Sequence, residues 1–226
     1  MASALNTQGI ALSNSGYFKR ALDVFKKKLE INEEDGNLKG VGNSYVNMAL
    51  IYYDQGNYKV ALDYLQNGLS IYEELKHETG IAYALGNIGL VYEKQLRYED
   101  ALQCYRTNFK VNEELGDQRG MAYAYNNIGN LLSLQSRFDS AVYYFEKSLD
   151  HFAEIGDIDG KAYAIGNIGN VYMNQGSFET SLSYSEKALM LSQQMGSLFQ
   201  INKYSQLLYR AYRELDRKST RLNSSH

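Results

Sequence analysis

Four asparagines recur at intervals of forty residues, at Asn47, Asn87, Asn127 and Asn167. A carboxamide carries both a donor and an acceptor, so it can hydrogen-bond the N–H and C=O groups of an extended peptide backbone. Asparagine is also a poor residue inside a helix, because its amide competes for backbone hydrogen bonds. Four copies at one spacing therefore predict a role for the amides. Two roles stay open: the amides hold a bound polypeptide, or they bond a neighbouring helix and fix the interface between repeats.

No residues form a catalytic or metal-binding constellation. None of His77, His151 and His226 stands at metal-ligand spacing with a second histidine or cysteine. The sequence has no nucleophile elbow, and no phosphate loop with its lysine. Cys104 aligns with tyrosines in other parts of the chain, which favours a packed structural thiol over a reactive one. We therefore expect no enzymatic activity in this segment, no metal site and no cofactor.

The elements that must position the asparagines repeat with the same period of forty. Gly40, Gly80, Gly120 and Gly160 open four blocks that align without a gap. The first forty residues fit the same register, and a sixth copy starts near Asn202 and stops early. Self-similarity at such a period is typical of stacked structural repeats. The chain contains no proline, as expected of uninterrupted helices.

Each block contains two helical patterns. Apolar or small residues recur at helical spacing over Ile81–Gln95 and again over Tyr98–Leu115, with a short turn at Leu96–Arg97 between them. Gly116 suits a helix end in the left-handed conformation. Lys76 occupies the matching place one block earlier, so we expect that helix to end differently.

Small residues inside the first helix of each block predict close helix packing. Gly89, Gly129 and Gly169 lie mid-helix, where glycine costs about 1 kcal/mol relative to alanine. That cost is tolerable where the missing side chain lets two helices approach. We expect Ala101 and Ala141 to be the partners across the pair.

Helix pairs with a small residue at Gly89, a tyrosine at Tyr92 and an alanine at Ala101 resemble the tetratricopeptide repeat. The resemblance covers residues 2 to about 215. It implies an all-α, right-handed α-solenoid of antiparallel helix pairs, with about five repeats and a terminal helix. We expect the repeats at about 2–41, 42–81, 82–121, 122–161 and 162–201, followed by a partial sixth helix at 202–215. The forty-residue form is similar to that of Pins-type adaptors and of bacterial signalling proteins.

The resemblance also implies a concave groove that is lined by the first helices. The predicted peptide-binding residues are asparagines and tyrosines of that face: Asn43, Asn47, Tyr83, Asn87, Tyr123, Asn126, Asn127, Asn130, Tyr163, Asn167 and Asn170. The chaperone-tail clamp of this family grips a terminal carboxylate with lysine or arginine beside the asparagine. The groove positions beside the recurring asparagines, from Val46 in the second block to Asn170 in the fifth, carry no lysine or arginine. We therefore do not expect that clamp.

The charge and hydropathy of the chain limit its partners. The formal net charge of −3 gives no basic face for nucleic acid or an anionic membrane, and no apolar run approaches a membrane span. We expect a protein or an extended peptide as partner. The N-terminus lacks the layout of a signal peptide, which favours a cytoplasmic location. The periplasm is the alternative if the native N-terminus is missing.

The last eleven residues, Asp216–His226, read as the translation of a sequence that resembles a sequencing-library adapter. We expect this tail to be non-native, and the natural protein to be cut within its sixth repeat. The helix before the tail would then lack its partner helix. Leu207, Leu208, Tyr212 and Leu215 can form its apolar stripe, and we expect self-association through the part that stays exposed.

Two functions remain open from the sequence. The first is a scaffold that binds a protein or peptide in an asparagine- and tyrosine-lined groove. The second is a sensory or regulatory module of a larger signalling protein, a histidine kinase or a transcription regulator, whose output domain followed residue 215.

Overall fold

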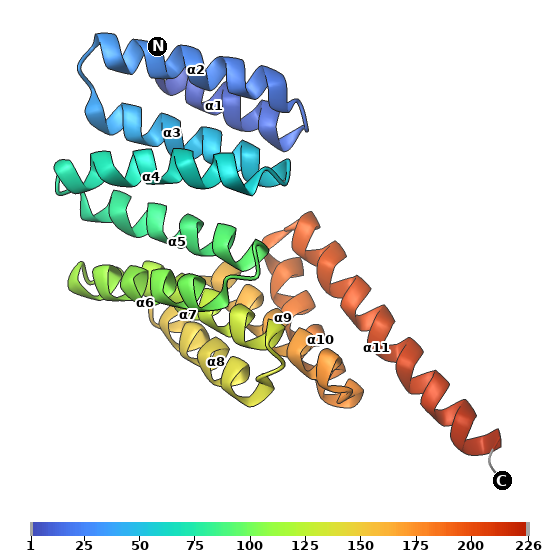
Figure 1. Cartoon of the computed structure of the whole chain (residues 1–226). Coiled ribbons are helices and arrows are strands. Elements are labelled where there is room, and N and C mark those ends of the chain that lie inside the picture. Colours follow the sequence, from blue (N-terminus) through green and yellow to red (C-terminus); the bar gives the residue numbers. More distant parts are fainter. Residues whose placement is uncertain (1, 225–226) are drawn as a thin grey trace. The chain divides into compact units, whose positions relative to one another are not determined.

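The structure is a computed structural model that describes residues 2–224. Over that range the chain is all-helical, with eleven helices and no strand (Figure 1). Successive helices pack as pairs, as the repeat predicts. The helices are α1 (Ala2–Asn14), α2 (Phe18–Glu34), α3 (Leu38–Asp54), α4 (Tyr58–Glu74), α5 (Glu78–Lys94), α6 (Tyr98–Glu114), α7 (Gln118–Leu134), α8 (Phe138–Glu154), α9 (Ile158–Gln175), α10 (Phe178–Met195) and α11 (Leu198–Ser224).

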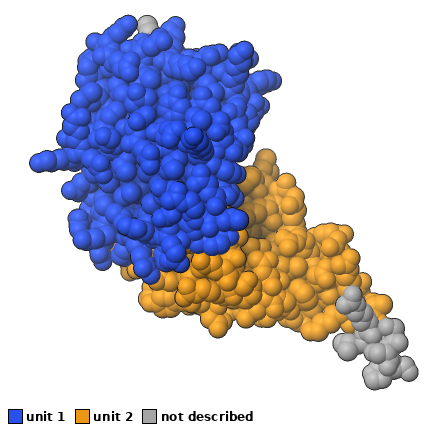
Figure 2. All heavy atoms as spheres, in the orientation of Figure 1, with its two compact units in different colours: residues 1–115 blue, residues 116–226 orange. Residues whose placement is uncertain are grey.

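The helix pairs group into two compact units, residues 1–115 and residues 116–226 (Figure 2). The first unit contains α1 to α6 and the second contains α7 to α11. Within each unit the first helices of successive pairs contact one another, α3 with α5, α7 with α9, and α9 with α11. The first helices begin at Leu38, Glu78, Gln118 and Ile158, four residues before the expected repeat boundaries.

In three of the pairs, the mid-helix glycine of the first helix faces an aromatic ring of the second, whereas a Cβ atom on Gly169 would lie 3.1 Å from the hydroxyl of Ser185. A Cβ atom on Gly129 would lie 2.8 Å from the ring of Phe145, and one on Gly9 would lie 2.6 Å from the ring of Phe25. Tyr105 fills the same place against Gly89. The expectation that Ala101 and Ala141 are the partners was wrong. These alanines are fully buried, but the ring that requires the glycine stands four residues later in the chain.

The glycines that open the blocks have a second steric reason. A Cβ atom on Gly80 would lie 2.6 Å from Tyr72, and one on Gly160 would meet the ring of Phe152. Each ring belongs to the preceding second helix, so the glycine lets one pair pack on the next. The backbone N–H groups of these glycines also donate hydrogen bonds to the side chains that cap the first helices.

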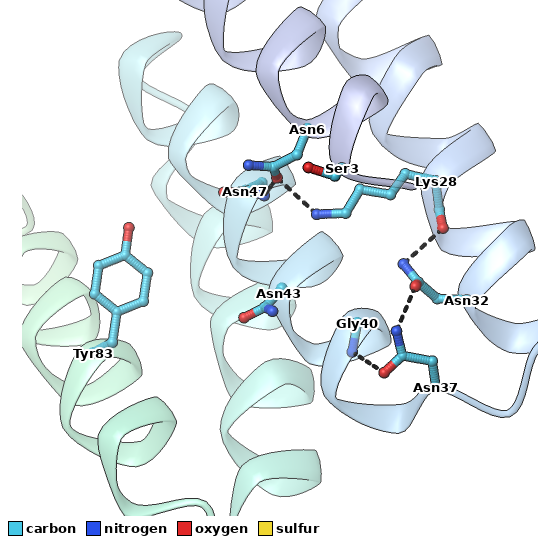
Figure 3. Close-up of a pocket in the computed structure, with 9 residues that line it drawn as sticks. All are labelled: Ser3, Asn6, Lys28, Asn32, Asn37, Gly40, Asn43, Asn47 and Tyr83. Carbon is cyan, nitrogen blue, oxygen red and sulfur yellow. Dashed lines mark hydrogen bonds between the residues drawn. The ribbon is translucent and has the colours of Figure 1, made fainter. Parts of the chain in front are cut away.

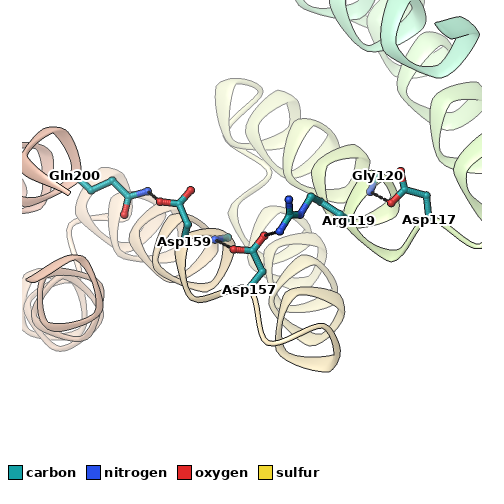
Figure 4. Close-up of polar contacts among 7 residues, drawn as sticks. Asp117, Arg119, Gly120, Asp157, Asp159 and Gln200 are labelled. Atoms are coloured by element: carbon teal, nitrogen blue, oxygen red, sulfur yellow. Dashed lines mark hydrogen bonds and ion pairs between the residues drawn. The ribbon is translucent and has the colours of Figure 1, made fainter. Parts of the chain in front are cut away.

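Four side chains cap the first helices three residues before those glycines. The backbone N–H groups of the block-opening glycines donate to Asn37, His77, Asp117 and Asp157 at 2.9–3.0 Å. Such a cap satisfies a helix N–H group that has no partner within the helix. Figure 4 shows the caps of the second unit, where Asp157 also pairs with Arg119 at 2.9 Å. Caps and the ion pair therefore join the N-terminal ends of α7 and α9.

The second helix of each pair ends in a left-handed residue, whatever its type. Gly36, Gly116, Gly156 and Gly196 have φ between 64° and 67°, and Lys76 has φ of 50° at the matching place. The N–H of Lys76 donates to the carbonyl of Glu73 at 3.0 Å, as Gly36 does to Glu33 at 3.1 Å. The expectation of a different helix end at Lys76 was therefore wrong. The repeat geometry imposes the conformation, and the lysine adopts it at a steric cost.

The last helix, α11, packs on α10 and begins four residues before the expected start. Its buried stripe consists of Tyr204, Leu207 and Ala211. Leu207 is buried, and Tyr212 is 55% exposed, in keeping with the expectation that part of the apolar stripe stays exposed. The helix continues to Ser224, and the side chains of residues 216–220 are exposed. Whether these residues are native stays a prediction, and His226 lies outside the described range.

Candidate peptide-binding surface

We call the predicted asparagine and tyrosine positions of the first helices the first-helix face of each unit. It lies on α3 and α5 in the first unit and on α7 and α9 in the second. Its asparagines at the forty-residue spacing have different hydrogen-bond partners. Asn87 donates to the backbone carbonyl of Tyr83, one turn earlier in its own helix, at 2.8 Å. Asn47 donates to the side chain of Asn6 at 3.0 Å. Asn127 is half-buried. None of these three is withdrawn into the core.

Asn167 and Asn126 have a different environment. Asn126 is fully buried and donates to Ser148 in α8 at 2.8 Å, while its carbonyl oxygen accepts from Asn167 at 3.2 Å. Asn167 is 8% exposed. Because the amide of Asn126 is bonded on both sides, it fixes α7, α8 and α9 together. The side chain of Asn126 is therefore not accessible to a ligand, contrary to our prediction. This residue belongs to the interface between repeats.

The tyrosines of the first-helix face are half-exposed. Tyr83 is 52% exposed and Tyr123 is 44% exposed, with the Tyr123 ring edge against Phe152 at 5.2 Å between ring centroids. The ammonium of Lys203 lies 4.7 Å from the centroid of the Tyr163 ring. A half-exposed tyrosine offers apolar area and a hydroxyl at low entropic cost, which suits contact with a bound chain.

In the second unit the face continues onto α11. Asn170 is exposed and Asn130 is half-buried. A cavity of about 230 Å³ is lined by Asn167, Asn170, Lys203 and Arg210, among others. Arg210 stands forty residues after Asn170, so it occupies the same register position. Carrying the register into the sixth copy would have predicted this cation.

The first unit has a larger cavity, of about 420 Å³, between α1, α2 and α3. Figure 3 shows Asn6, Lys28, Asn43 and Asn47 around it, with Tyr83 opposite on α5. Asn43 is exposed, and its carbonyl oxygen accepts from the hydroxyl of Tyr72 at 2.7 Å. The sequence argument missed Lys28 because it considered flanking positions of the first helices only. Forty residues later the same position holds Gly68, so no repeat signal could have revealed this lysine.

The residues that we considered for other chemistry have structural contacts. Nδ1 of His77 accepts the Gly80 N–H as the cap of α5. Burial raises the pKa of the Cys104 thiol to about 11, so the reactive thiolate is scarce at neutral pH. Among residues 2–224 no group of three histidine, cysteine or acidic side chains is placed to hold a metal ion. In the same range no helix is long and apolar enough to cross a membrane.

Comparison with known proteins supports the repeat on sequence grounds. A family model described as tetratricopeptide repeat matches residues 1–74 and 80–154, and a second model of that description matches residues 162–195. A comparison with curated proteins gave no match.

Solved structures share the fold at low sequence identity. Aspartyl phosphate phosphatase F from Bacillus subtilis is 18% identical, with a TM-score of 0.79 over 96% of this chain and 58% of that one. A Rap protein in complex with competence and sporulation factor is 16% identical, with a TM-score of 0.75 over 94% and 63%. A signal transduction ATPase with numerous domains and a tetratricopeptide repeat sensor, from Pyrococcus horikoshii, is 15% identical, with a TM-score of 0.71 over 99% and 37%. The chain thus spans less than two thirds of each of these proteins.

Proposed function

Because the chain belongs to the tetratricopeptide repeat family, we propose that its first-helix face binds an extended segment of another protein. The observation that carries the proposal is the placement of Tyr83 and Asn87 on α5 in the first unit and, separately, of Tyr123 on α7 in the second unit. These residues lie on first helices of successive pairs, and none of them is buried in the core. The amides would bond the backbone of the segment and the rings would cover its side chains. Asn126 and Asn167 would hold the helices that carry this face.

The chemistry of the remaining side chains favours binding over catalysis. The Cys104 thiol is held neutral by burial, and His77 is used as a helix cap. The family fold is in general a non-enzymatic protein-interaction scaffold. One structural neighbour is named a phosphatase, but a likeness at 18% identity extends to the fold alone. We propose that this segment has no activity of its own.

A second function is a regulatory module of a longer signalling protein. The observation that favours it is the length of the structural neighbours. This chain covers 58% of the phosphatase and 37% of the ATPase with the repeat sensor. In this arrangement binding of a protein or peptide by the repeats would control another domain. The sequence of the complete gene would distinguish the two functions.

Hydrogen–deuterium exchange in the presence of a selected peptide tests the binding face. Peptides are first selected from a random-sequence display library on the immobilised chain, and exchange is then measured with and without a selected peptide. We expect protection on the first-helix face of at least one unit, that is, in α3 and α5 or in α7 and α9. Protection confined to the second helices, or to the tail of α11, would contradict the proposal.

A further inference from the structure

The side chain that caps α5 differs in chemistry from the other three caps of the first helices. Nδ1 of His77 accepts the Gly80 N–H at 2.9 Å, whereas the matching places hold an asparagine and two aspartates. An asparagine amide does not titrate, and an aspartic acid ordinarily loses its proton at about pH 4. Histidine ordinarily changes its charge between about pH 5 and 8. The cap of α5 is therefore the one whose chemistry changes near neutral pH.

The hydrogen bond between His77 and Gly80 requires the neutral ring. Nδ1 can accept only while it carries no proton, because an imidazolium donates from both of its nitrogens. Protonation would set the Nδ1–H of His77 against the N–H of Gly80, which would keep only its second contact, the His77 carbonyl at 2.9 Å. The positive end of the helix dipole also disfavours a cation at this place. The ring must therefore turn away from the helix end when it binds a proton.

The charged groups around His77 offer an imidazolium no partner. The titratable side chains on the adjoining ends of α3, α4 and α5 and in the turn before His77 are Lys39, Tyr72, Glu73, Glu74, Lys76 and Glu78. Burial raises the pKa of Tyr72 to about 12, so its hydroxyl stays neutral, and the other five side chains are exposed. Within residues 2–224, no acidic side chain forms an ion pair with His77.

The ring of His77 also contacts the support of the first-helix face in the first unit. It packs on Tyr72, with 5.6 Å between the ring centroids, and the Tyr72 hydroxyl donates to Asn43 on α3 at 2.7 Å. The helix that His77 caps, α5, carries Tyr83 and Asn87. A movement of this ring therefore acts on both first helices that form the face, on α3 through Tyr72 and on α5 directly.

We propose that protonation of His77 releases the cap of α5 and weakens binding at the first-helix face of the first unit. This inference rests on the proposed function of that face, and it adds a regulation by pH: a segment is held at neutral pH and released in acid. The capped state needs the neutral ring, so the unfolded chain binds this proton more readily. Stability contributed by the cap is therefore present at about pH 7.5 and lost as the pH falls toward about 5.5.

Thermal unfolding without a peptide tests the cap. His77→Asn keeps an acceptor that does not titrate, as Asn37 does one repeat earlier. Between pH 7.5 and 5.5 the melting temperature of the parent should fall by about 2–4 °C more than that of His77→Asn. His151→Asn is the matched control, because Nδ1 of His151 donates to the Gln118 carbonyl oxygen and protonation leaves that bond in place. It should follow the parent. Equal falls in the parent and in His77→Asn would overturn the proposal.

Amide exchange measured by NMR locates the change. The protection factor of the Gly80 N–H is compared with that of the Gly40 N–H, whose cap, Asn37, does not titrate. In the parent the ratio of the two should fall about threefold between pH 7.5 and 5.5, whereas in His77→Asn it should stay constant. A constant ratio in the parent would show that the cap survives protonation, and the proposal would fail.

Peptide binding at the two pH values tests the link to function. The peptide is one selected on the immobilised chain that contains no histidine and protects α3 and α5 from exchange. Its dissociation constant should rise about threefold from pH 7.5 to 5.5 with the parent and stay constant with His77→Asn. Equal binding by the parent at both pH values would overturn the regulation and leave the proposed function standing. If no peptide protects α3 and α5 at either pH, the proposed function of this face fails, while the melting temperatures still decide whether the cap is released.

Discussion

Asn87 in the first unit and Asn167 in the second stand at one register position but have opposite surroundings. In the first unit, Asn87 bonds its own helix and stays half-exposed. In the second unit, Asn167 is buried and bonds Asn126, which in turn bonds Ser148. The position in the repeat is the same, so the neighbours decide the role. Where Asn126 stands in the second unit, the first unit has Gly86, which offers no side chain to bond. The repeat therefore determines where an amide lies along the helix, whereas the neighbouring residues determine which group it bonds.

The largest expected effect separates Asn126 from Asn87 in stability. Asn126→Ala leaves the Ser148 hydroxyl and the Asn167 amide buried with a lost partner, so the free energy of unfolding should fall by about 2 kcal/mol. Asn87→Ala should leave it unchanged or slightly raised, because alanine is the better helix former. Urea denaturation of the two variants measures the difference. Equal losses in both would remove the distinction between the two asparagines.

A compensating variant checks the reason for that loss. Replacing both partners by apolar groups, as in Asn126→Leu with Ser148→Ala, should recover part of the stability that Asn126→Ala loses. Asn67→Ala is a surface control, since Asn67 is exposed on α4. It should change the free energy of unfolding by less than about 0.5 kcal/mol.

The two residues that follow α4 extend the comparison to backbone conformation. Lys76 and its neighbour Leu75 have φ of 50° and −78°. Lys76→Gly should stabilise the chain by about 0.5–1 kcal/mol, because a left-handed conformation is costly for a residue with a Cβ atom. Leu75→Gly should instead destabilise it by a similar amount, because that conformation is open to any residue. Thermal unfolding of the pair gives both signs, and a loss at Lys76 would show that the lysine side chain stabilises the turn.

The pH dependence of Lys28→Met tests the unpaired ammonium. Burial lowers the pKa of Lys28 below its ordinary 10.5, so the folded state disfavours the charged form. That cost is fully present below the lowered pKa and fades as the pH rises toward 10.5. Lys28→Met should therefore be more stable than the parent at pH 7, and its advantage should shrink as the pH rises toward 10.5. An advantage that grows with pH would contradict a lowered pKa.

The fold was predictable from the sequence because small and apolar residues recur at the same positions of each forty-residue block. Gly89, Tyr92 and Ala101, repeated at that period, indicated helix pairs, although the aromatic rings against Gly89 and Gly129 were not foreseen. The site was only partly predictable, since a hydrogen bond such as that between Asn126 and Ser148 depends on which residues face each other across helices. Lys28 could not be found by any register argument, because it has no counterpart in the other repeats.

Titration of a selected peptide into the Asn87→Ala variant tests the central claim, that accessible amides of the first helices hold a bound chain. A hydrogen bond contributes about 1 kcal/mol, so the dissociation constant should rise about fivefold. The melting temperature should stay the same or rise, and Asn67→Ala on the second helix should leave both quantities unchanged. An unchanged dissociation constant for Asn87→Ala, or one that rises only together with a lost fold, would contradict the claim.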